Sequence, residues 1–184
     1  NNFREVIENS LCEANNGRLI TFGIKPNSPE TGYGYINSYE ELDKEKFSSI
    51  IKNFVEKPNL ELAKKFIKDK HYSWNSGIFL FKATTFLKEL EKFEPEIIKV
   101  CKKSLKKGSK DLDFLRINEK EFKKCPNKSI DIALMEKTTL GSVFMLEAGW
   151  DDIGNWKSVW RNSKKDKSGN CSNGKVVIED SKNC

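Results

Sequence analysis

The chain contains 184 residues with a formal net charge of +6, and 37% of its residues are hydrophobic. Twelve Phe and four Trp supply large side chains for burial, which excludes a disordered chain and fits one globular domain. No apolar run reaches the roughly eighteen residues of a membrane helix, and the N-terminus lacks the basic and apolar stretches of a secretion signal. We therefore predict a soluble, cytoplasmic protein without a membrane partner.

Cysteine and lysine usage narrows the class of protein further. The five cysteines are widely spaced, without a CxxC pair or a histidine cluster, which predicts reduced thiols in a cytoplasm. Lysines are mixed with acidic residues except in "CKKSLKKGSK" at 101–110. Because no aromatic residues alternate with these lysines, a solvated helix end is favoured over a nucleic-acid site, and no nucleic-acid partner is predicted.

The first part of the chain predicts one helix and then strands that end in polar clusters. Apolar residues at helical spacing in 3–16 predict a helix, and a strand is predicted at 18–24. Prolines and "ETGYGYI" follow, so this strand leads into a glycine-rich turn. Another strand begins at 50 and ends in "EKP" at 56–58, before a helix at 60–69.

The stretch "WNSGIFLF" at 74–81 combines an apolar strand with a polar start. Gly77–Phe81 predicts a strand that is buried on both faces, yet an aromatic, an amide and a hydroxyl side chain precede it. If these polar groups lie at the end of a strand, they can face a ligand.

The remaining segments continue the alternation of helix and strand. They are helices around 86–93 and 97–101, a helix with an N-cap serine at 129–137, a strand at 142–149 and a helix from 154. The alternation predicts an α/β fold with a mixed, mainly parallel sheet flanked by helices. Ligands of such sheets bind beyond the carboxyl ends of strands, so the polar clusters "ETGYG", "EKP", "WNSG" and "WDDIG" are expected to form one site.

Two of these clusters suit a phosphorylated sugar. The Glu56 carboxylate can accept hydrogen bonds from neighbouring hydroxyls, and the Lys57 ammonium suits a phosphate. For "EKP" alone, an exposed strand end with an ion pair is the favoured alternative. Gly34 allows close backbone approach to a ligand, although a simple turn at Gly32 and Gly34 is the commoner case. Asn75 offers an amide, with a turn-forming role as an equal alternative.

The segment "GWDDIGNW" at 149–156 contains two adjacent acids before a helix. Successive side chains point in different directions, so only one of Asp151 and Asp152 is expected to face a site. A single aspartate is a reasonable half-site for Mg²⁺, which completes its octahedron with water and phosphate oxygens. Capping of the following helix is an equally good explanation for these acids.

The chain resembles the mannose-1-phosphate guanylyltransferase family of sugar-nucleotide pyrophosphorylases in five motifs that occur in order: "FGIKPNSPETGYGYI", "FVEKP", "WNSGIFLF", "SIDIALMEKT" and "AGWDDIGNW". The motifs extend from about Phe22 to Trp160. The resemblance implies a Rossmann-like nucleotidyltransferase domain of the glycosyltransferase-A type, present in part at 1–165, with 166–184 as a linker and the start of a following β segment.

The resemblance implies transfer of GMP from GTP to mannose 1-phosphate, which yields GDP-mannose and pyrophosphate with Mg²⁺ as cofactor. Gly34 would contact the sugar through its backbone, Glu56 would accept from sugar hydroxyls, and Asn75 would bond the hexose. Lys57 would face the sugar phosphate and Asp152 would bind Mg²⁺, which gives both a catalytic role.

The family's opening loop GxGxRLWPxSR and its PADH segment do not occur in these 184 residues. The resemblance therefore implies that nucleotide-binding residues lie elsewhere and that the isolated chain is inactive. We also expect exposed apolar sheet edges, with dependence on a complementary N-terminal chain or a homo-oligomer. The alternatives are a non-catalytic sugar-nucleotide-binding or regulatory paralogue, and a pyrophosphorylase for another sugar nucleotide.

Overall fold

The computed structural model describes residues 2–43 and 45–184, and the chain forms two compact units. The first unit extends to Ala148, and the second spans Gly149–Cys184. The domain boundary that the sequence suggested, after residue 165, falls within the second unit.

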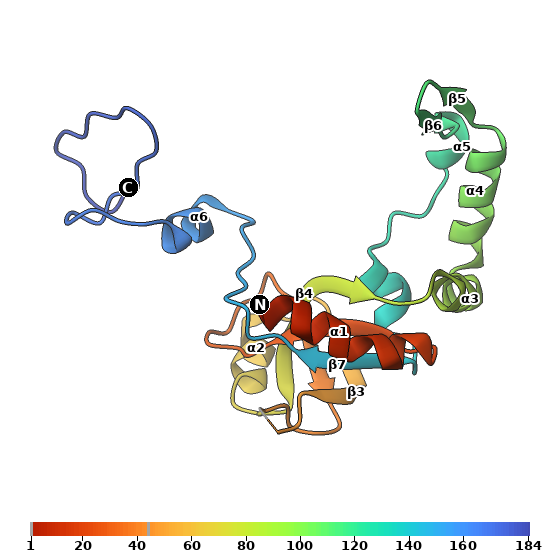
Figure 1. The fold of residues 1–184 in the computed structure, drawn as a ribbon, viewed down its shortest axis with the longest axis horizontal. Helices are drawn as coiled ribbons and strands as arrows, with labels where there is room; N and C mark the ends of the chain where they lie inside the picture. The colour runs from red at the N-terminus through yellow and green to blue at the C-terminus, as the bar shows by residue number, and fades with distance from the viewer. Residues whose placement is uncertain (1, 44) are drawn as a thin grey trace. The chain divides into compact units, whose positions relative to one another are not determined.

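Five strands of the first unit close into a barrel in the order β1–β4–β2–β3–β7 (Figure 1). They are β1 (Leu19–Ile24), β2 (Tyr35–Ser38), β3 (Ser48–Val55), β4 (Tyr72–Leu80) and β7 (Gly141–Met145). Strand β1 pairs in parallel with β7, while the other four pairings are antiparallel. The mixed character of the predicted sheet is confirmed for the described strands, but the expectation of a mainly parallel sheet is wrong.

The connections explain the antiparallel pairings. Parallel neighbours need a crossover of a dozen or more residues, usually through a helix, whereas antiparallel strands can follow each other directly. Strands β2 and β3 are joined by a short segment without a helix and lie side by side as antiparallel neighbours. Strands β1 and β7 are separated by most of the helices and are the parallel pair. The alternation in the sequence indicates the elements but not which strands become neighbours.

The barrel is closed by a short contact between β3 and β7, in which Ser48–Ile50 pairs with residues 142–144. Because each of the five described barrel strands has a neighbour on both sides, the exposed apolar edges expected from the sequence are not found among them, although β7 pairs with only three residues of β3. All six residues of β1 are buried. One hydrophobic cluster brings together side chains from the strands, from the segment between β2 and β3 and from the segment before β7: Leu19, Ile36, Leu42, Phe54, Leu134, Met135 and Val143.

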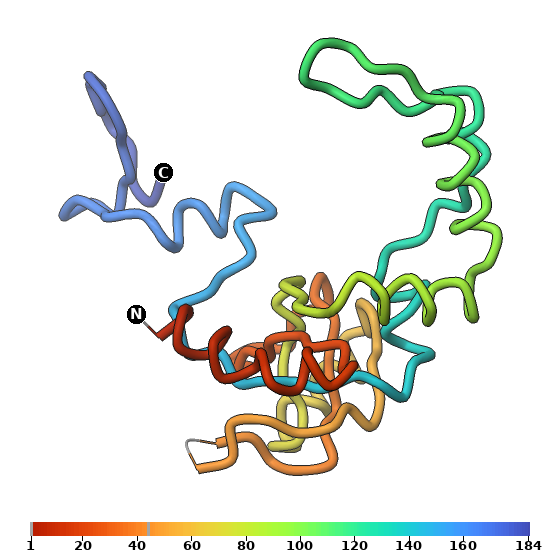
Figure 2. The backbone as a smooth tube through the Cα atoms, turned by 45° about the vertical axis from the view of Figure 1, so that its right-hand side comes forward, coloured from red at the N-terminus to blue at the C-terminus, as the bar shows by residue number. Residues whose placement is uncertain are grey.

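Helices cover the barrel and extend from it. Helix α1 (Asn2–Asn15) contacts β1, β4 and β7. It confirms the N-terminal helix predicted from the sequence. Helix α2 (Leu60–Phe66) follows β3. Figure 2 shows α3 and α4 as two successive helices, with a change of chain direction between them, in an arm that extends from the barrel. The bounds of the arm are α3 (Ala83–Phe93), α4 (Pro95–Lys106), the hairpin β5 (Ser109–Asp111) and β6 (Phe114–Arg116), and α5 (Glu119–Phe122). The hairpin was not predicted.

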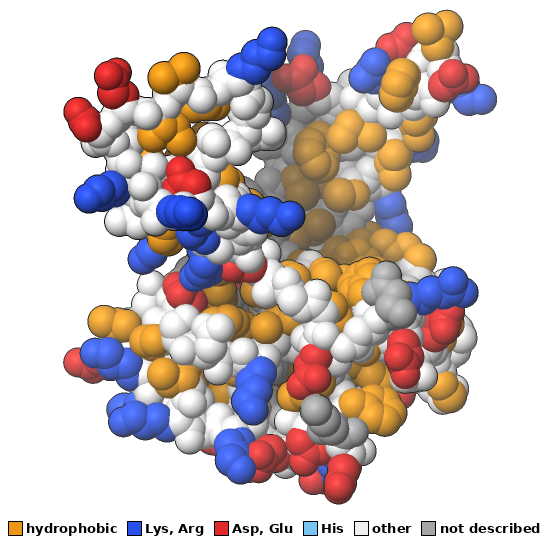
Figure 3. Space-filling view, turned by 60° about the vertical axis from the view of Figure 1, so that its left-hand side comes forward, with side chains coloured by type: hydrophobic (Ala, Val, Ile, Leu, Met, Phe, Trp, Pro, Cys, Tyr) orange, Lys and Arg blue, Asp and Glu red, His pale blue; other side chains and the backbone are white. Residues whose placement is uncertain are grey.

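The lysine-rich segment at 101–110 contains the end of α4, as predicted, and continues into β5; its lysines are exposed, whereas Ser104 is buried. On the face shown in Figure 3, Lys and Arg side chains are interspersed with Asp and Glu side chains rather than gathered in one patch. Within the described residues, every helix is too short or too polar to cross a bilayer.

One carboxylate holds the end of the helical arm together. The Glu121 side chain is only 9% exposed and forms ion pairs with Lys103, Lys107 and Lys124. Hydrogen bonds from these three ammonium groups, led by the one from Lys107, lower the pKa of Glu121 to about 2. The charged form of this carboxylate therefore stabilises the contact between α4 and α5.

We expect the Glu121→Gln variant to be less stable than the wild type at pH 7, by an amount that shrinks as the pH falls from about 4.5 to about 2. The folded pKa lies below the unfolded value of about 4.3, so the stabilisation is present above the unfolded pKa and is lost as the pH falls through the folded pKa. Urea unfolding at several pH values measures the difference. Glu119→Gln, at a 78% exposed side chain, is the control, and a pH-independent difference for Glu121→Gln would contradict the assignment.

Candidate functional site

The polar start of "WNSGIFLF" lies inside β4 rather than ahead of it. Residues Trp74, Asn75 and Ser76 are buried, whereas Ile78 to Leu80 are only half-buried, which reverses the predicted burial. The pairing between β1 and β4 is irregular here. Thr21 and Gly23 are two positions apart in β1, whereas their partners, Phe79 and Asn75, are four positions apart in β4. Gly77 has a φ of 72° within this bulge, a conformation that glycine adopts without strain. The bulge at Gly77 therefore helps to determine where the Asn75 and Ser76 side chains lie in the barrel.

Three of the residues predicted for the site meet at this point. The backbone N–H of Asn75 donates to the Gly34 carbonyl at 2.8 Å. A Cβ atom on Gly34 would lie 2.7 Å from Glu56 Oε2 and 3.3 Å from the Asn75 Cβ. Gly34 therefore gives Glu56 and Asn75 room to approach each other, whereas a Cβ on Gly32 would meet no atom within 4 Å among the described residues.

Glu56 and Lys57 follow the last residue of β3 and differ in burial. The Glu56 side chain is 15% exposed, the Lys57 side chain is 64% exposed, and their charged groups lie 3.2 Å apart. An ion pair with one partner in solvent contributes little to stability. Lys57 also has a φ of 47°, a left-handed conformation that is uncommon for a lysine. Such backbone strain is concentrated at functional sites in proteins.

The Asn75 side chain is held by groups that the sequence had not suggested. Its Oδ1 accepts from Thr21 Oγ1 at 2.8 Å and from the Gly77 N–H at 3.3 Å, and its Nδ2 donates to Asp131 Oδ1 at 3.0 Å. Asp131 begins η1 (Asp131–Met135), a π-helix at the place where a helix with a serine cap was predicted. Just after η1, Glu136 Oε1 accepts from the backbone N–H of Glu56 at 3.2 Å. Residues Asp131 and Glu136 thus contact Asn75 inside β4 and Glu56 just after β3.

The sequence analysis predicted an ordinary helix here and did not detect the π-helical form of η1. "SIDIALMEK" carries apolar residues that fill the core, Ala133, Leu134 and Met135, so its pattern predicted only an ordinary buried helix. π-Helices are rare and often occur at functional sites. The acids at both ends of the motif, Asp131 and Glu136, are the residues that touch the site.

Trp74 belongs to the core rather than to an open sugar-binding surface. Its side chain is buried, with 6% of the residue exposed, and the Tyr33 ring meets it edge-on at a centroid distance of 5.1 Å. Beside it, burial raises the pKa of Tyr35. The burial of Trp74 therefore assigns this side chain to the core.

The two acids of "GWDDIGNW" belong to the second unit and have different environments. Asp151 accepts from Arg161 at 2.6 and 2.9 Å and from Asn162 Nδ2 at 2.7 Å. Asp152 is exposed, and its carboxylate lies beside Gly154. The sequence-based alternative of an aspartate cap is wrong, because the cap of α6 (Trp156–Asn162) is Asn155, which accepts from the Ser158 N–H at 2.9 Å. The role of Asp152 as a metal ligand remains a prediction.

Among the described residues there is no group of three or more His, Cys, Asp or Glu side chains that could hold a metal ion. Mg²⁺ does not need such a group, since it is commonly held by one or two carboxylates together with substrate phosphates and water. The chemistry of Asp152, an exposed carboxylate, fits this mode of binding.

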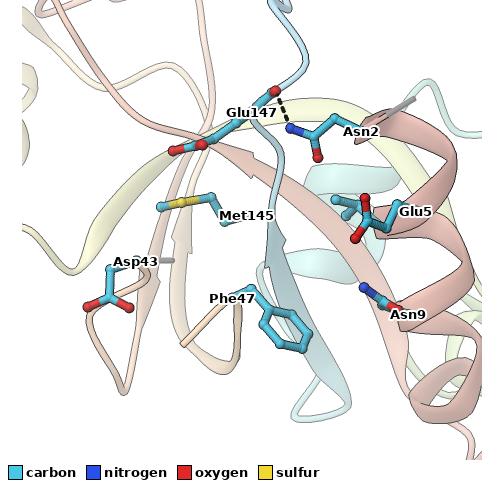
Figure 4. Close-up of a pocket in the computed structure, with 8 residues that line it drawn as sticks. Asn2, Glu5, Asn9, Asp43, Phe47, Met145 and Glu147 are labelled. Carbon is cyan, nitrogen blue, oxygen red and sulfur yellow. Dashed lines mark hydrogen bonds between the residues drawn. The ribbon is translucent and has the colours of Figure 1, made fainter. Parts of the chain in front are cut away.

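A cavity of about 220 Å³ lies elsewhere on the first unit, between α1, the segment before β3 and the end of β7 (Figure 4). Its wall includes Glu5, Phe47 and Met145, and Asn2 Nδ2 donates to the Glu147 carbonyl at 2.6 Å across one end. None of the residues predicted for the sugar site lines this cavity, so it is not the candidate site.

Comparison with known proteins gives consistent matches over nearly all of the chain. A putative mannose-1-phosphate guanylyltransferase of Vibrio cholerae is 44% identical over 182 residues, which cover 99% of this chain and 39% of that protein. The alginate biosynthesis protein AlgA of Pseudomonas syringae pv. tomato is 46% identical over 171 residues, which cover 93% of this chain and 35% of that protein. The chain therefore spans about two fifths of the length of these curated relatives.

A solved structure shows the same fold. The crystal structure titled mannose-6-phosphate isomerase from Helicobacter pylori superposes with a TM-score of 0.71 at 34% sequence identity, covering 82% of this chain and 57% of that chain. The family model described as nucleotidyl transferase matches residues 1–169, which is most of the chain. The chain belongs to the nucleotidyl transferase family.

Proposed function

We propose that this chain provides the sugar-phosphate site for the transfer of GMP from GTP to mannose 1-phosphate, which yields GDP-mannose and pyrophosphate. The observation that carries the proposal is the meeting of Gly34, Glu56 and Asn75 at the bulge of β4. The names of the relatives, which include a mannose-1-phosphate guanylyltransferase of Escherichia coli, support the choice of sugar and nucleotide.

The geometry suits a hexose 1-phosphate. Glu56 presents a largely buried carboxylate, which accepts hydrogen bonds from sugar hydroxyls, and the absence of a side chain on Gly34 leaves room for this carboxylate beside Asn75. Lys57 is exposed beside Glu56 and can turn its ammonium to the phosphate. A phosphate monoester has a second pKa of about 6, so it is mostly ionised at neutral pH and needs no general base. The chain's contribution to the reaction is then positioning and charge neutralisation.

Asp152 is the proposed protein ligand of Mg²⁺, which would neutralise charge on the reacting phosphates. We expect Asp152→Asn, in the gene product that carries this chain, to raise the Mg²⁺ concentration for half-maximal activity at least about tenfold, because a neutral amide is a weaker ligand than a carboxylate. A titration of activity with Mg²⁺ measures this. Asp151→Asn is the matched control, since it breaks the contact with Arg161 and is expected to lower stability without changing the Mg²⁺ requirement. Equal Mg²⁺ curves for the wild type and Asp152→Asn would contradict the proposed role.

We propose further that the nucleotide is bound outside these 184 residues, in a complementary polypeptide or a longer form of the chain. A homo-oligomer, in which another copy completes the site, is the alternative. Release of pyrophosphate from GTP, mannose 1-phosphate and Mg²⁺ tests the function. The 184-residue chain alone is expected to be inactive, and the gene product with its upstream coding sequence is expected to be active. GDP-mannose formation by the isolated chain would overturn the proposed incompleteness. Sugar binding without activity in either form would instead support a regulatory paralogue, and higher activity with another sugar phosphate would support a different pyrophosphorylase.

A further inference from the structure

The side-chain amide of Asn75 has two possible orientations, and its neighbours decide between them. Thr21 Oγ1 lies 2.8 Å from the amide and 3.2 Å from the Ile78 carbonyl. A hydroxyl can donate or accept, so Thr21 is compatible with either orientation of the amide. In one orientation it donates to Asn75 Oδ1. In the other it would accept from the amide nitrogen and donate to Ile78.

Asp131 and Gly77 are not ambiguous in this way. A carboxylate only accepts hydrogen bonds, and a backbone N–H only donates them. Asp131 Oδ1 lies 3.0 Å from one end of the Asn75 amide, and the Gly77 N–H lies 3.3 Å from the other end. The reverse orientation would place the amide oxygen against a carboxylate oxygen and two N–H groups against each other. Asp131 therefore holds Nδ2 on its own side and Oδ1 on the side of Thr21 and Gly77.

This orientation limits what Asn75 can offer to a ligand. Oδ1 already accepts from Thr21 and Gly77, which uses both of its lone pairs. Nδ2 has two protons, and Asp131 takes one of them. The group left for a ligand is one N–H donor on Asn75, a residue that packs against Gly34 as Glu56 does, and the Glu56 carboxylate can only accept.

We propose that Asp131 is a positioning residue that fixes Asn75 as a hydrogen-bond donor in the sugar site, so that the site pairs one donor with the acceptor Glu56. The inference rests on the proposed sugar site and adds the polarity of its contacts. A matching ligand presents a hydroxyl proton to Glu56 and an oxygen lone pair to Asn75, as neighbouring hydroxyls of a hexose do. Asp131 acts through Asn75 and is not itself a catalytic residue.

The first test observes the amide directly and needs no ligand. In NMR spectra of the ¹⁵N-labelled chain, the side-chain amide signal of Asn75 is assigned through its loss in Asn75→Ala. We expect this signal to shift or double in Asp131→Asn, because an amide at 131 can donate as well as accept and so permits both orientations. Asp113→Asn, at an exposed position of the β5–β6 turn, is the control and should leave the signal unchanged. An unchanged signal in Asp131→Asn would overturn the inference.

The second test separates positioning from stability. We expect calorimetric affinity for mannose 1-phosphate to fall about tenfold in Asp131→Asn, the size of one charge-assisted hydrogen bond. The double variant Asn75→Asp/Asp131→Asn exchanges the two side chains and is called the exchanged pair. It restores a hydrogen bond between positions 75 and 131, but a carboxylate at 75 has no N–H to donate to the ligand. Its thermal stability should be close to that of the wild type, while its affinity should fall further than that of Asp131→Asn. If the exchanged pair binds mannose 1-phosphate as the wild type does, the donor role is wrong. If the wild type itself does not bind, the proposed function fails, while the NMR result still decides the orientation of the amide.

Discussion

Replacing Glu56 by glutamine is expected to weaken mannose 1-phosphate binding by about 10- to 100-fold, the effect of losing one or two hydrogen bonds to a charged acceptor. The Glu56 side chain is 15% exposed and lies beside Gly34 and Asn75, so a bound sugar would replace its remaining water. Glutamine keeps the shape of the side chain but replaces one acceptor oxygen with an amino group. Isothermal titration of the folded 184-residue chain measures the affinity.

Glu61→Gln is the matched control, because Glu61 is exposed in the first turn of α2, five residues further along the chain. It should bind mannose 1-phosphate as the wild type does. Under the simpler explanation, Glu56 serves only as the ion-pair partner of Lys57, and Glu56→Gln would change stability by no more than about 1 kcal/mol and leave binding intact. Unchanged affinity in both Glu56→Gln and Asn75→Ala would remove the sugar site from this part of the barrel.

Adding one methyl group at Gly34 is expected to abolish sugar binding, whereas the same change two residues earlier should have no effect. A Cβ on Gly34 would lie 2.7 Å from Glu56 Oε2, 3.2 Å from Phe54 Cζ and 3.3 Å from the Asn75 Cβ. The end of the Glu56 side chain can move away, but it would then leave the position in which it meets the ligand. Phe54 is buried and cannot move easily, so overpacking should also lower stability by about 1–3 kcal/mol.

Gly32→Ala is the control for this change, since a Cβ there meets nothing within 4 Å among the described residues. Neither glycine has a positive φ, so backbone strain does not enter the comparison. Affinity and thermal unfolding of the two variants are measured together. Similar affinities for mannose 1-phosphate in Gly34→Ala and Gly32→Ala would show that close packing at Gly34 has no part in binding.

The sequence was a good guide to local structure wherever one feature dominated. The helical spacing of 3–16 led to α1, and the apolar run at 18–24 led to β1, because periodic burial depends on neighbours along the chain. It was a poor guide to the bulge in β4. The bulge arises because two positions of β1 pair with residues four positions apart on β4, and this mismatch depends on the partner strand and on Gly77. The same limit applies to η1, where an ordinary helical pattern became a π-helix.

The candidate site shows the same division. Glu56, Lys57 and Asn75 were recognisable because their chemistry is unusual at the end or the start of an apolar segment. Thr21 and Asp131 were not recognisable, since a threonine in a strand and an aspartate at the start of a helix are ordinary. They matter only because the barrel places them 2.8 and 3.0 Å from the Asn75 amide.

The amino-acid sequence by itself determined the residue types of the site, the order of most elements and the membership of the nucleotidyl transferase family. Only the tertiary structure decided that β1, β4, β2, β3 and β7 close into a barrel, and that Gly34, Glu56 and Asn75 meet at a bulge. The physical reason is that periodicity and composition report on neighbours within a few residues. Strand pairing and the direction of a buried amide depend instead on groups more than fifty positions away, such as Thr21 and Asp131 for Asn75.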